Sequence, residues 1–331
     1  MSPFKFIDLF AGVGGMRIAF ERNGGKCVFS SEWDRYCQKT YYKNFGDMPV
    51  GDITKIEAKD IPNHDILIGG FPCQPFSSIG KREGFEHPTQ GTLFFDIVRI
   101  LKEKKPASFL LENVSGLKHH DGGNTFRQIV ETLQNELGYF VTTRELDAAD
   151  YGVPQHRKRI YIVGFINKVQ TQNNFSFEWP EKQKEKVGIG PFIESHADGY
   201  SISEHLQSSY IYKKDDGRPQ VIDKNSNIQV KTLCSTYHKI QRLTGTFVKD
   251  GRTGLRLLSH NECKAIMGFP KDFKFPVSRT QMYRQMGNSV AIPVVQAIAK
   301  QMMEVLNYFS KNTVEQPNRS ALTKNEYIAA V

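Results

Sequence analysis

Cysteine is scarce in this chain of 331 residues, and the spacing of the five cysteines argues against both a disulfide framework and a zinc site. The residues form no CxxC pair and no histidine lies at ligand spacing from any of them, so we expect neither a disulfide framework nor a zinc or other metal site. A reducing, cytoplasmic setting fits this usage. The cysteines are Cys27, Cys37, Cys73, Cys234 and Cys263.

Long apolar runs are also missing from the sequence. No stretch approaches the length of a transmembrane span, and the first ten residues lead into a strand pattern rather than a signal peptide. With 39% hydrophobic and 24% charged residues, the composition is that of a soluble globular protein, so we expect no membrane partner.

Acidic residues are outnumbered by basic ones. Forty-four Lys and Arg against 35 Asp and Glu leave a formal charge of +9, which favours a polyanionic partner without proving one. At ~150 residues per domain, the length suggests roughly two domains with a sizeable core.

The first half of the chain alternates strand and helix patterns, which predicts an α/β fold with a mostly parallel sheet. A glycine turn joins the first strand to the first helix, and the second strand ends next to Glu32. We expect strands at 5–10, 27–30, 64–70, 107–112 and 159–165, and helices at 16–23, 93–104 and 124–137.

The character changes after the strand at 159–165. Helical periodicity fades from about 169 to 254, where we expect a second, smaller and loop-rich domain. Ten Lys or Arg against four Asp give residues 213–256 a net +6. Helices return at 259–270, with Ser259 and Glu262 forming a capping box, and at 292–308. The polar tail after residue 310 is either disordered or a short docking helix.

Gly12, Gly14 and Gly15 occupy the turn after the first strand, which permits close approach of a ligand. Their spacing departs from the GxGxxG dinucleotide fingerprint, so a nucleoside is the better guess, with Glu32 on its ribose hydroxyls. The plain alternative is a tight connection between strand and helix with a solvated Glu32.

Cys73 lies between two prolines directly after a strand, where α/β proteins place their chemistry. As a thiolate it would be a strong nucleophile. For the other four cysteines we expect the ordinary role of small buried hydrophobes.

Two further segments carry candidate catalytic groups. Glu112 ends an apolar strand, where burial would raise its pKa and make it a proton donor; alternatively it caps the next helix. Gln155, Arg157 and Arg159 would share one strand face by period two, so that both guanidinium groups converge on the catalytic loop, unless they form a basic edge strand.

In its ordered motifs the chain resembles the DNA (cytosine-5) methyltransferases, specifically the single-chain bacterial modification enzymes. The resemblance covers about 4–175 and 255–308, and 176–254 matches the family's variable target-recognition domain in position and character. The motifs that carry it are 6–15, 32–34, 51–54, 72–77, 91–94, 112–114, Gln155 with Arg157 and Arg159, 256–270 and 285–290.

The resemblance implies a mechanism. Cys73 attacks C6 of a cytosine, Glu112 interacts with N3, and C5 takes the methyl group of S-adenosylmethionine before elimination frees the thiol. Arg157 and Arg159 would hold the base and the catalytic loop. Because the ring is unreachable in a stacked duplex, the target base must be flipped out.

The resemblance also implies binding residues. Around the cofactor, Phe10 and Trp33 would sandwich adenine, Glu32 would take the ribose, and Asp52 with Ile53 would meet the adenine edge. The remaining cofactor wall would be Gly12, Val13, Gly14, Gly15, Leu93 and Asn288. For contact with DNA we predict Gln74, Ser77, Thr236, Tyr237, His238, Lys239 and Arg242.

The predicted organisation is a catalytic and cofactor-binding domain from 1–175 plus 255–310, a target-recognition domain at 176–254 and a tail at 311–331. We expect a monomer acting on double-stranded DNA, with a restriction endonuclease as possible genetic partner. Three rivals remain: an RNA cytosine-5 methyltransferase, an NAD-dependent dehydrogenase, and a DNA-binding regulator without activity. The basic insert argues against RNA, and the segment around Cys73 argues against the dehydrogenase.

Overall fold

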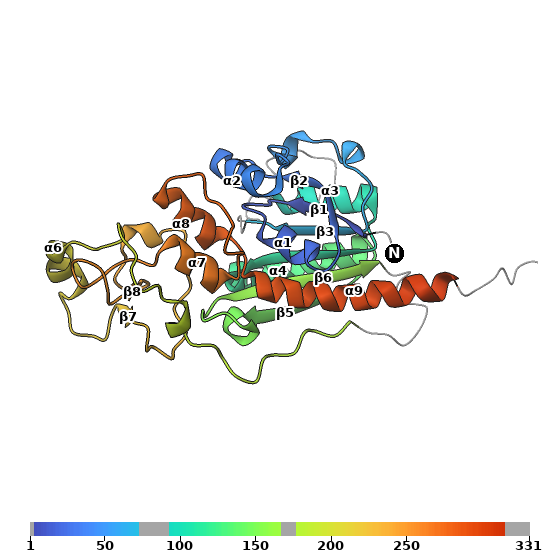
Figure 1. Ribbon diagram of the computed structural model, residues 1–331. Coiled ribbons are helices and arrows are strands. Elements are labelled where there is room, and N and C mark those ends of the chain that lie inside the picture. Colours follow the sequence, from blue (N-terminus) through green and yellow to red (C-terminus); the bar gives the residue numbers. More distant parts are fainter. Residues whose placement is uncertain (1–2, 73–92, 167–176, 315–331) are drawn as a thin grey trace, which may run out of the picture.

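A computed structural model of the chain describes residues 3–72, 93–166 and 177–314, and it shows a twisted sheet with helices on both faces (Figure 1). The six strands lie in the order β2-β1-β3-β4-β6-β5. This confirms the predicted α/β class. The strands are β1 (Lys5–Leu9), β2 (Lys26–Ser31), β3 (Ile66–Gly70), β4 (Ser108–Val114), β5 (Tyr139–Asp147) and β6 (Lys158–Ile166).

The sheet is parallel on one side and antiparallel on the other. Strands β2, β1, β3 and β4 pair in parallel, whereas β6 runs antiparallel to both β4 and β5. The sequence pattern did not predict β5. The carboxyl ends of the four parallel strands therefore meet at one edge, next to the start of β6.

Alternating side chains explain why helices cover both faces. Phe6 and Leu110 belong to one apolar cluster, while their neighbours Ile7 and Leu111 belong to the other. Helices α1 (Gly15–Glu21) and α9 (Ile292–Val314) pack on the first face. Helices α3 (Leu93–Lys104) and α4 (Asn124–Glu131) pack on the second, and α2 (Arg35–Phe45) follows β2.

The region after the sheet contains short elements joined by long loops, as the sequence predicts. Strands β7 (Gln220–Ile222) and β8 (Thr246–Val248) pair in parallel, and α6 spans Glu204–Leu206. This smaller region lies at the left of Figure 1, and α7 (His260–Met267) and α8 (Arg279–Asn288) lie between it and the sheet.

Helix α9 differs from the prediction in two ways. It continues to Val314, beyond both the predicted end at 308 and the proposed start of the tail at 311. The stretch 279–308, which comprises α8 and most of α9, also has the length and apolar composition of a membrane span, contrary to the expectation that no segment approaches one. Half of that apolar window is buried inside the protein, which is typical of a core helix.

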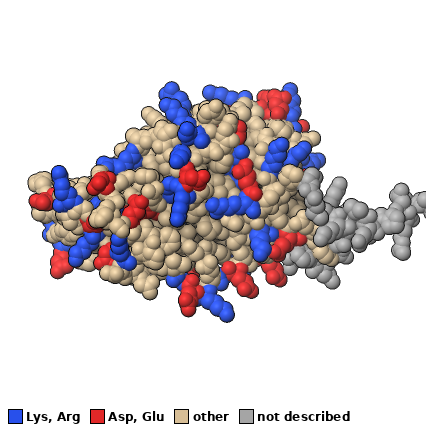
Figure 2. All heavy atoms as spheres, in the orientation of Figure 1, with Lys and Arg blue, Asp and Glu red and all other residues tan. Residues whose placement is uncertain are grey.

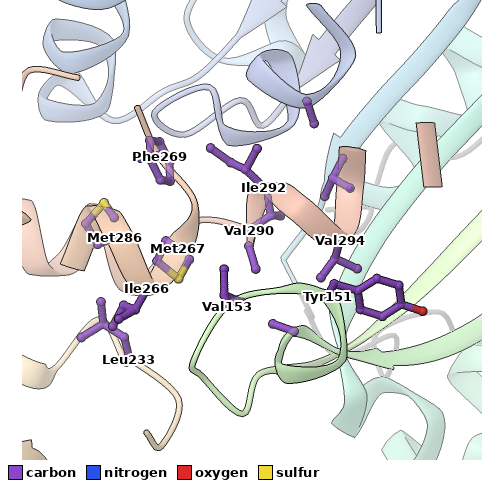
Figure 3. Close-up of a cluster of buried hydrophobic side chains, with 14 of the residues drawn as sticks. Tyr151, Val153, Leu233, Ile266, Met267, Phe269, Met286, Val290, Ile292 and Val294 are labelled. Carbon is purple, nitrogen blue, oxygen red and sulfur yellow. The ribbon is translucent and has the colours of Figure 1, made fainter. Parts of the chain in front are cut away.

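The two regions share one apolar core. Figure 3 shows Leu233 of the smaller region beside Ile266, Met267 and Met286 of helices α7 and α8, with Val153 approaching from the catalytic side. All five side chains are at most 2% exposed. The smaller region is therefore packed firmly against the region that contains the six-stranded sheet rather than tethered by a linker.

Candidate active site

The glycine turn after β1 leaves open space where a ligand can approach. Phe10 and Gly12 both have φ of 55° and Gly14 has φ of 85°, a left-handed conformation that favours glycine. A Cβ atom on Gly12 would meet nothing within 4 Å, whereas one on Gly14 would collide with the ring of Phe45. The side of Gly12 on which a Cβ atom would stand is therefore open, whereas Gly14 permits tight packing of α1 against α2.

Glu32 closes the turn from β2. One carboxylate oxygen accepts the backbone N–H of Gly12 at 2.8 Å, and the other accepts that of Asp34 at 2.7 Å. Burial raises the pKa of Glu32, and these backbone donors partly offset that rise. The carboxylate is thereby held beside the glycine turn, with lone pairs left for ribose hydroxyls.

The other predicted cofactor residues come from separate elements of the chain. Trp33 is 71% exposed after β2, Leu93 is half-buried at the start of α3, and Asn288 is exposed at the end of α8. Asp52 caps a short helical turn that contains the buried Ile53. That loop is tied to β2 because the Glu32 N–H donates to the Val50 carbonyl.

Glu112 lies at the carboxyl end of β4, paired with Gly70 of β3. A Cβ atom on Gly70 would come within 3.3 Å of its carboxylate, so glycine leaves room there. Arg159 of β6 forms an ion pair with Glu112, with Nε to Oε1 at 3.0 Å. Burial raises the pKa of Glu112, and Arg159 and Arg157 partly offset the rise. The predicted proton donor is therefore half-buried and held by Arg159.

The segment that carries Cys73 leaves the sheet beside Glu112. Asn113, the next residue on β4, donates its side-chain amide to the Phe71 carbonyl at 2.9 Å. This bond fixes the start of the catalytic segment to the strand that carries Glu112. Cys73, Gln74 and Ser77 themselves lie outside the described residues.

The predicted strand face with Gln155, Arg157 and Arg159 is wrong in part. Strand β6 begins at Lys158, so only Arg159 belongs to it. Arg157 is 2% exposed and donates to the carbonyls of Leu233, Gly287 and Ser289, not to Glu112. Gln155 is fully buried and bonded to long-range partners, so a basic edge strand is also excluded.

The predicted DNA contacts divide into buried and accessible residues. Tyr237 is buried and donates its hydroxyl to the Thr246 carbonyl. Arg242 is also buried, forming an ion pair with Asp216, so neither offers its polar group to DNA in this structure. Thr236 and His238 are half-buried and Lys239 is exposed, which leaves these three available.

Four cysteines behave as small packing residues. Cys27, Cys37 and Cys234 are partly buried and Cys263 is buried. Burial raises the pKa of the Cys27 thiol to about 12 and also raises that of Cys37. Within the described ranges, no group of three or more His, Cys, Asp or Glu is arranged to hold a metal ion.

Sequence reasoning missed two buried polar features near the site. Asp8 on β1 is 1% exposed, and its Oδ2 atom has no hydrogen-bond partner. Arg256 is fully buried and pairs with Glu262 and Asp250. Asp8 stands inside an otherwise apolar strand, which is a visible signal, but the partners of Arg256 depend on packing that local patterns do not show.

Comparison with known proteins agrees with this geometry. A family model described as C-5 cytosine-specific DNA methylase matches residues 4–304. The chain belongs to this family. The protein is accordingly a DNA cytosine-5 methyltransferase.

Several bacterial proteins are similar to this methyltransferase along most of its length. Type II methyltransferase M.MspI of Moraxella sp is 62% identical over 95% of this chain and 74% of its own. M.BsuFI of Bacillus subtilis is 58% identical over 91% and 73%. M.NlaX of Neisseria lactamica is 44% identical over 94% and 100%.

Solved structures share the fold of this methyltransferase. The S. pombe Dnmt2 methyltransferase superposes with a TM-score of 0.73 at 20% identity, over 92% of this chain and 99% of its own. A Spodoptera frugiperda DNMT2 mutant has the same TM-score at 22% identity, with the same coverage. At this level of identity the likeness concerns the arrangement of the chain, not the substrate.

Proposed function

We propose that the protein transfers a methyl group from S-adenosylmethionine to C5 of a cytosine within a specific double-stranded DNA sequence, through a flipped base and a covalent bond between Cys73 and C6. The observation that carries this is the half-buried ion pair of Glu112 and Arg159 at the strand edge from which the Cys73 segment departs. A half-buried carboxyl beside an emerging nucleophile suits attack on a polarised ring.

The residues at this edge fit the cofactor. Open space at Gly12 and the fixed carboxylate of Glu32 suit a nucleoside, and the exposed Trp33 supplies a ring for stacking. The bound cofactor would supply an electrophilic methyl group. We infer that it contacts Phe10, Gly12, Val13, Gly14, Gly15, Glu32, Trp33, Asp52, Ile53, Leu93 and Asn288.

The chain's own groups would then act on the cytosine. The thiolate of Cys73 forms a bond to C6, and Glu112 in its protonated form donates to N3, which draws electron density from C6 and stabilises the enamine. Arg159 orients Glu112 and limits the rise of its pKa. After C5 is methylated, a base or water removes the C5 proton and the bond to Cys73 breaks.

The smaller region would face the DNA opposite this edge. The stretch 213–256 carries a net +6, and Thr236, His238 and Lys239 within it remain accessible for phosphate or base contacts. Figure 2 shows basic and acidic side chains interspersed on one face of the molecule, so a single continuous basic patch does not mark the site in that view.

The bacterial relatives support a cellular setting. Their names place them among type II methyltransferases, so we infer that this enzyme protects host DNA in the cytoplasm alongside a cognate restriction endonuclease. That endonuclease would be a genetic partner, not a subunit, and the enzyme would act as a monomer.

Covalent trapping tests the proposed nucleophile and substrate together. A random pool of duplexes containing 5-fluorocytosine is mixed with protein and S-adenosylmethionine, separated on a denaturing gel, and the shifted DNA is sequenced. Replacing the C5 hydrogen by fluorine blocks elimination, so a complex linked to Cys73 should accumulate. Cys73→Ala serves as the negative control, and Cys263→Ala, which alters a buried cysteine, should still trap DNA.

The rival functions predict different outcomes of this experiment. Trapping of fluorinated RNA but not DNA would reassign the substrate to RNA. A shifted band that survives Cys73→Ala would refute the nucleophile, and DNA binding without any covalent band would favour a regulator that lacks activity.

A further inference from the structure

A segment of the smaller region pairs with the chain just before β6 through an isolated parallel β-bridge between Val230 and Gln155. The Val230 N–H donates to the Pro154 carbonyl at 2.8 Å, and the His156 N–H donates to the Val230 carbonyl at 2.9 Å. Beyond it, the Leu233 N–H donates to Oε1 of Gln155 at 2.8 Å. Residues 230–235, called the strut below, are thus held in register along 154–157, and they lead directly to the accessible Thr236.

Arg157 joins the strut to the cofactor wall. Its Nη1 donates to the Leu233 carbonyl at 3.1 Å, and its Nη2 donates to the carbonyls of Gly287 and Ser289 at 2.9 and 2.5 Å. The two latter carbonyls flank Asn288, a predicted cofactor residue. A planar guanidinium can bridge several acceptors in fixed geometry, which a lysine cannot reproduce.

Direct backbone contact reinforces this junction. A Cβ atom on Gly287 would lie 2.1 Å from the Ser235 backbone nitrogen, so the end of α8 rests against the strut itself. A Cβ atom on Gly15 would lie 2.7 Å from the Ser289 hydroxyl oxygen. Contact therefore runs without a gap from the strut, through 287–289, to the glycine turn of the cofactor site.

The electrostatic surroundings place the same arginine near the catalytic carboxyl. Burial and the nearby Arg159 together lower the pKa of Arg157 to about 10, although Glu112 opposes the change. Its two terminal nitrogens are used by backbone carbonyls rather than by a carboxylate. Arg157 is therefore built into the junction between the sites and is not presented to the base.

We propose that Arg157 is a positioning residue that couples the DNA-binding site to the cofactor site by fixing the strut against residues 287–289. DNA bound by the smaller region then raises the affinity for cofactor, and bound cofactor raises the affinity for DNA. The inference rests on the proposed function, because it needs both ligands. It assigns Arg157 a different role from Arg159, which orients Glu112.

Binding measurements on the ternary cycle test this coupling. The dissociation constant of S-adenosylhomocysteine is measured by calorimetry with and without a duplex that carries the sequence recovered by trapping. For the unaltered protein we expect DNA to tighten S-adenosylhomocysteine binding by roughly 5–150-fold. In Arg157→Lys the factor should fall close to one. By thermodynamic linkage, S-adenosylhomocysteine must tighten DNA binding by the same factor by which DNA tightens S-adenosylhomocysteine binding.

Two further variants separate coupling from a merely structural role. Gly287→Ala keeps Arg157 but wedges the strut away from α8, so it should lose the coupling as well. Lys264→Met is the matched control, because this buried ammonium also donates to two backbone carbonyls, those of Lys271 and Phe273, outside the junction. It should lower stability but keep the coupling factor when the binding measurements are made at a temperature at which the variant is fully folded, as thermal unfolding would verify.

The possible outcomes are distinct. If the unaltered protein binds neither ligand, the proposed function fails and the inference fails with it. If it binds both but the coupling factor is one, or if Arg157→Lys and Gly287→Ala keep the original factor, the inference alone is overturned. Should Gly287→Ala not fold, Arg157→Lys still decides the matter.

Discussion

At the scale of single residues, the protonation of Glu112 should control the alkaline side of the activity profile. Because burial raises the pKa of Glu112, its neutral form persists to higher pH than for an exposed carboxyl and is lost as pH rises through that value. We expect Glu112→Gln to lower kcat by about 10²–10⁴-fold and to remove the alkaline limb of the pH profile.

Single-turnover rates measured across the pH range check this prediction. The acidic limb, which requires the Cys73 thiolate, should persist in Glu112→Gln. An unchanged kcat, or an alkaline limb that survives in the variant, would show that Glu112 is not the proton donor.

Asp8 makes a second prediction at this scale, concerning stability. Burial raises its pKa from 3.8 to about 8, so the unfolded chain ionises first and the folded state loses stability as pH rises between these values. The slope from this group is at most about 1.4 kcal/mol per pH unit. Asp8→Asn should remove it.

Urea denaturation at several pH values measures the difference between the two proteins. The free energy of unfolding of the variant, relative to that of the natural protein, should rise steadily from pH 4 to 8. Above pH 8 the difference between the two free energies should become constant. A difference that does not vary with pH would mean that Asp8 does not titrate in this window.

The functional residues differ in how well the sequence predicts them. Glu112 lies at the end of an apolar strand that any strand pattern displays, and the structure places it there opposite Gly70 of β3. Arg157 lies in an equally clear pattern of period two, yet its partners are 76 and 130 residues away and hold it elsewhere. A periodic pattern gives the local direction of a side chain, but long-range packing decides what it meets.

At the scale of elements, α7 is stabilised by the capping box predicted from Ser259 and Glu262, which the structure confirms. The Glu262 carboxylate also forms an ion pair with the fully buried Arg256 at 2.8 Å. Glu262→Ala should therefore destabilise the protein by about 3–5 kcal/mol, because it leaves a buried cation without this partner. Ser259→Ala should cost only about 1 kcal/mol.

Chemical denaturation of the two variants tests this ranking. Equal losses would mean that Glu262 acts only as a helix cap, not as the partner of a buried charge.

Helices and strands were predicted correctly where the residues of the segment itself determine its structure. The strand, glycine turn and helix at the start of the chain are marked by local residues and are found as predicted. Strand β5 was missed because its burial does not alternate regularly and its direction depends on pairing with β6. Helix α9 extends past its predicted end, to Val314.

At the scale of the whole molecule, the positive charge of residues 213–256 should make DNA binding dependent on salt. Lys239 is exposed, so if it meets a phosphate, Lys239→Gln should reduce the slope of log affinity against log salt by about one. Arg242→Gln should instead lower stability, because Arg242 is paired internally with Asp216.

Titrations of fluorescent duplex at several salt concentrations measure that slope, and thermal unfolding supplies the comparison. If Arg242→Gln changes the slope of log affinity against log salt without loss of stability, Arg242 contacts DNA after all. An unchanged slope for Lys239→Gln would exclude that side chain.

The arrangement of the two regions was beyond the reach of sequence reasoning. Composition marks the basic, loop-rich segment, but nothing local shows that Leu233 inserts among Ile266, Met267 and Met286 (Figure 3). No local sequence pattern predicts the contact between Gly287 and Ser235 either. The joint between recognition and catalysis is therefore a property of the folded whole.

The most direct test of the account is to identify the atom that receives the methyl group. Duplex DNA is incubated with the protein and S-adenosylmethionine carrying a deuterated methyl group, digested to nucleosides, and analysed by mass spectrometry. The account predicts the label on C5 of deoxycytidine, with none in Cys73→Ala. A label on an exocyclic nitrogen, or incorporation that persists without Cys73, would contradict it.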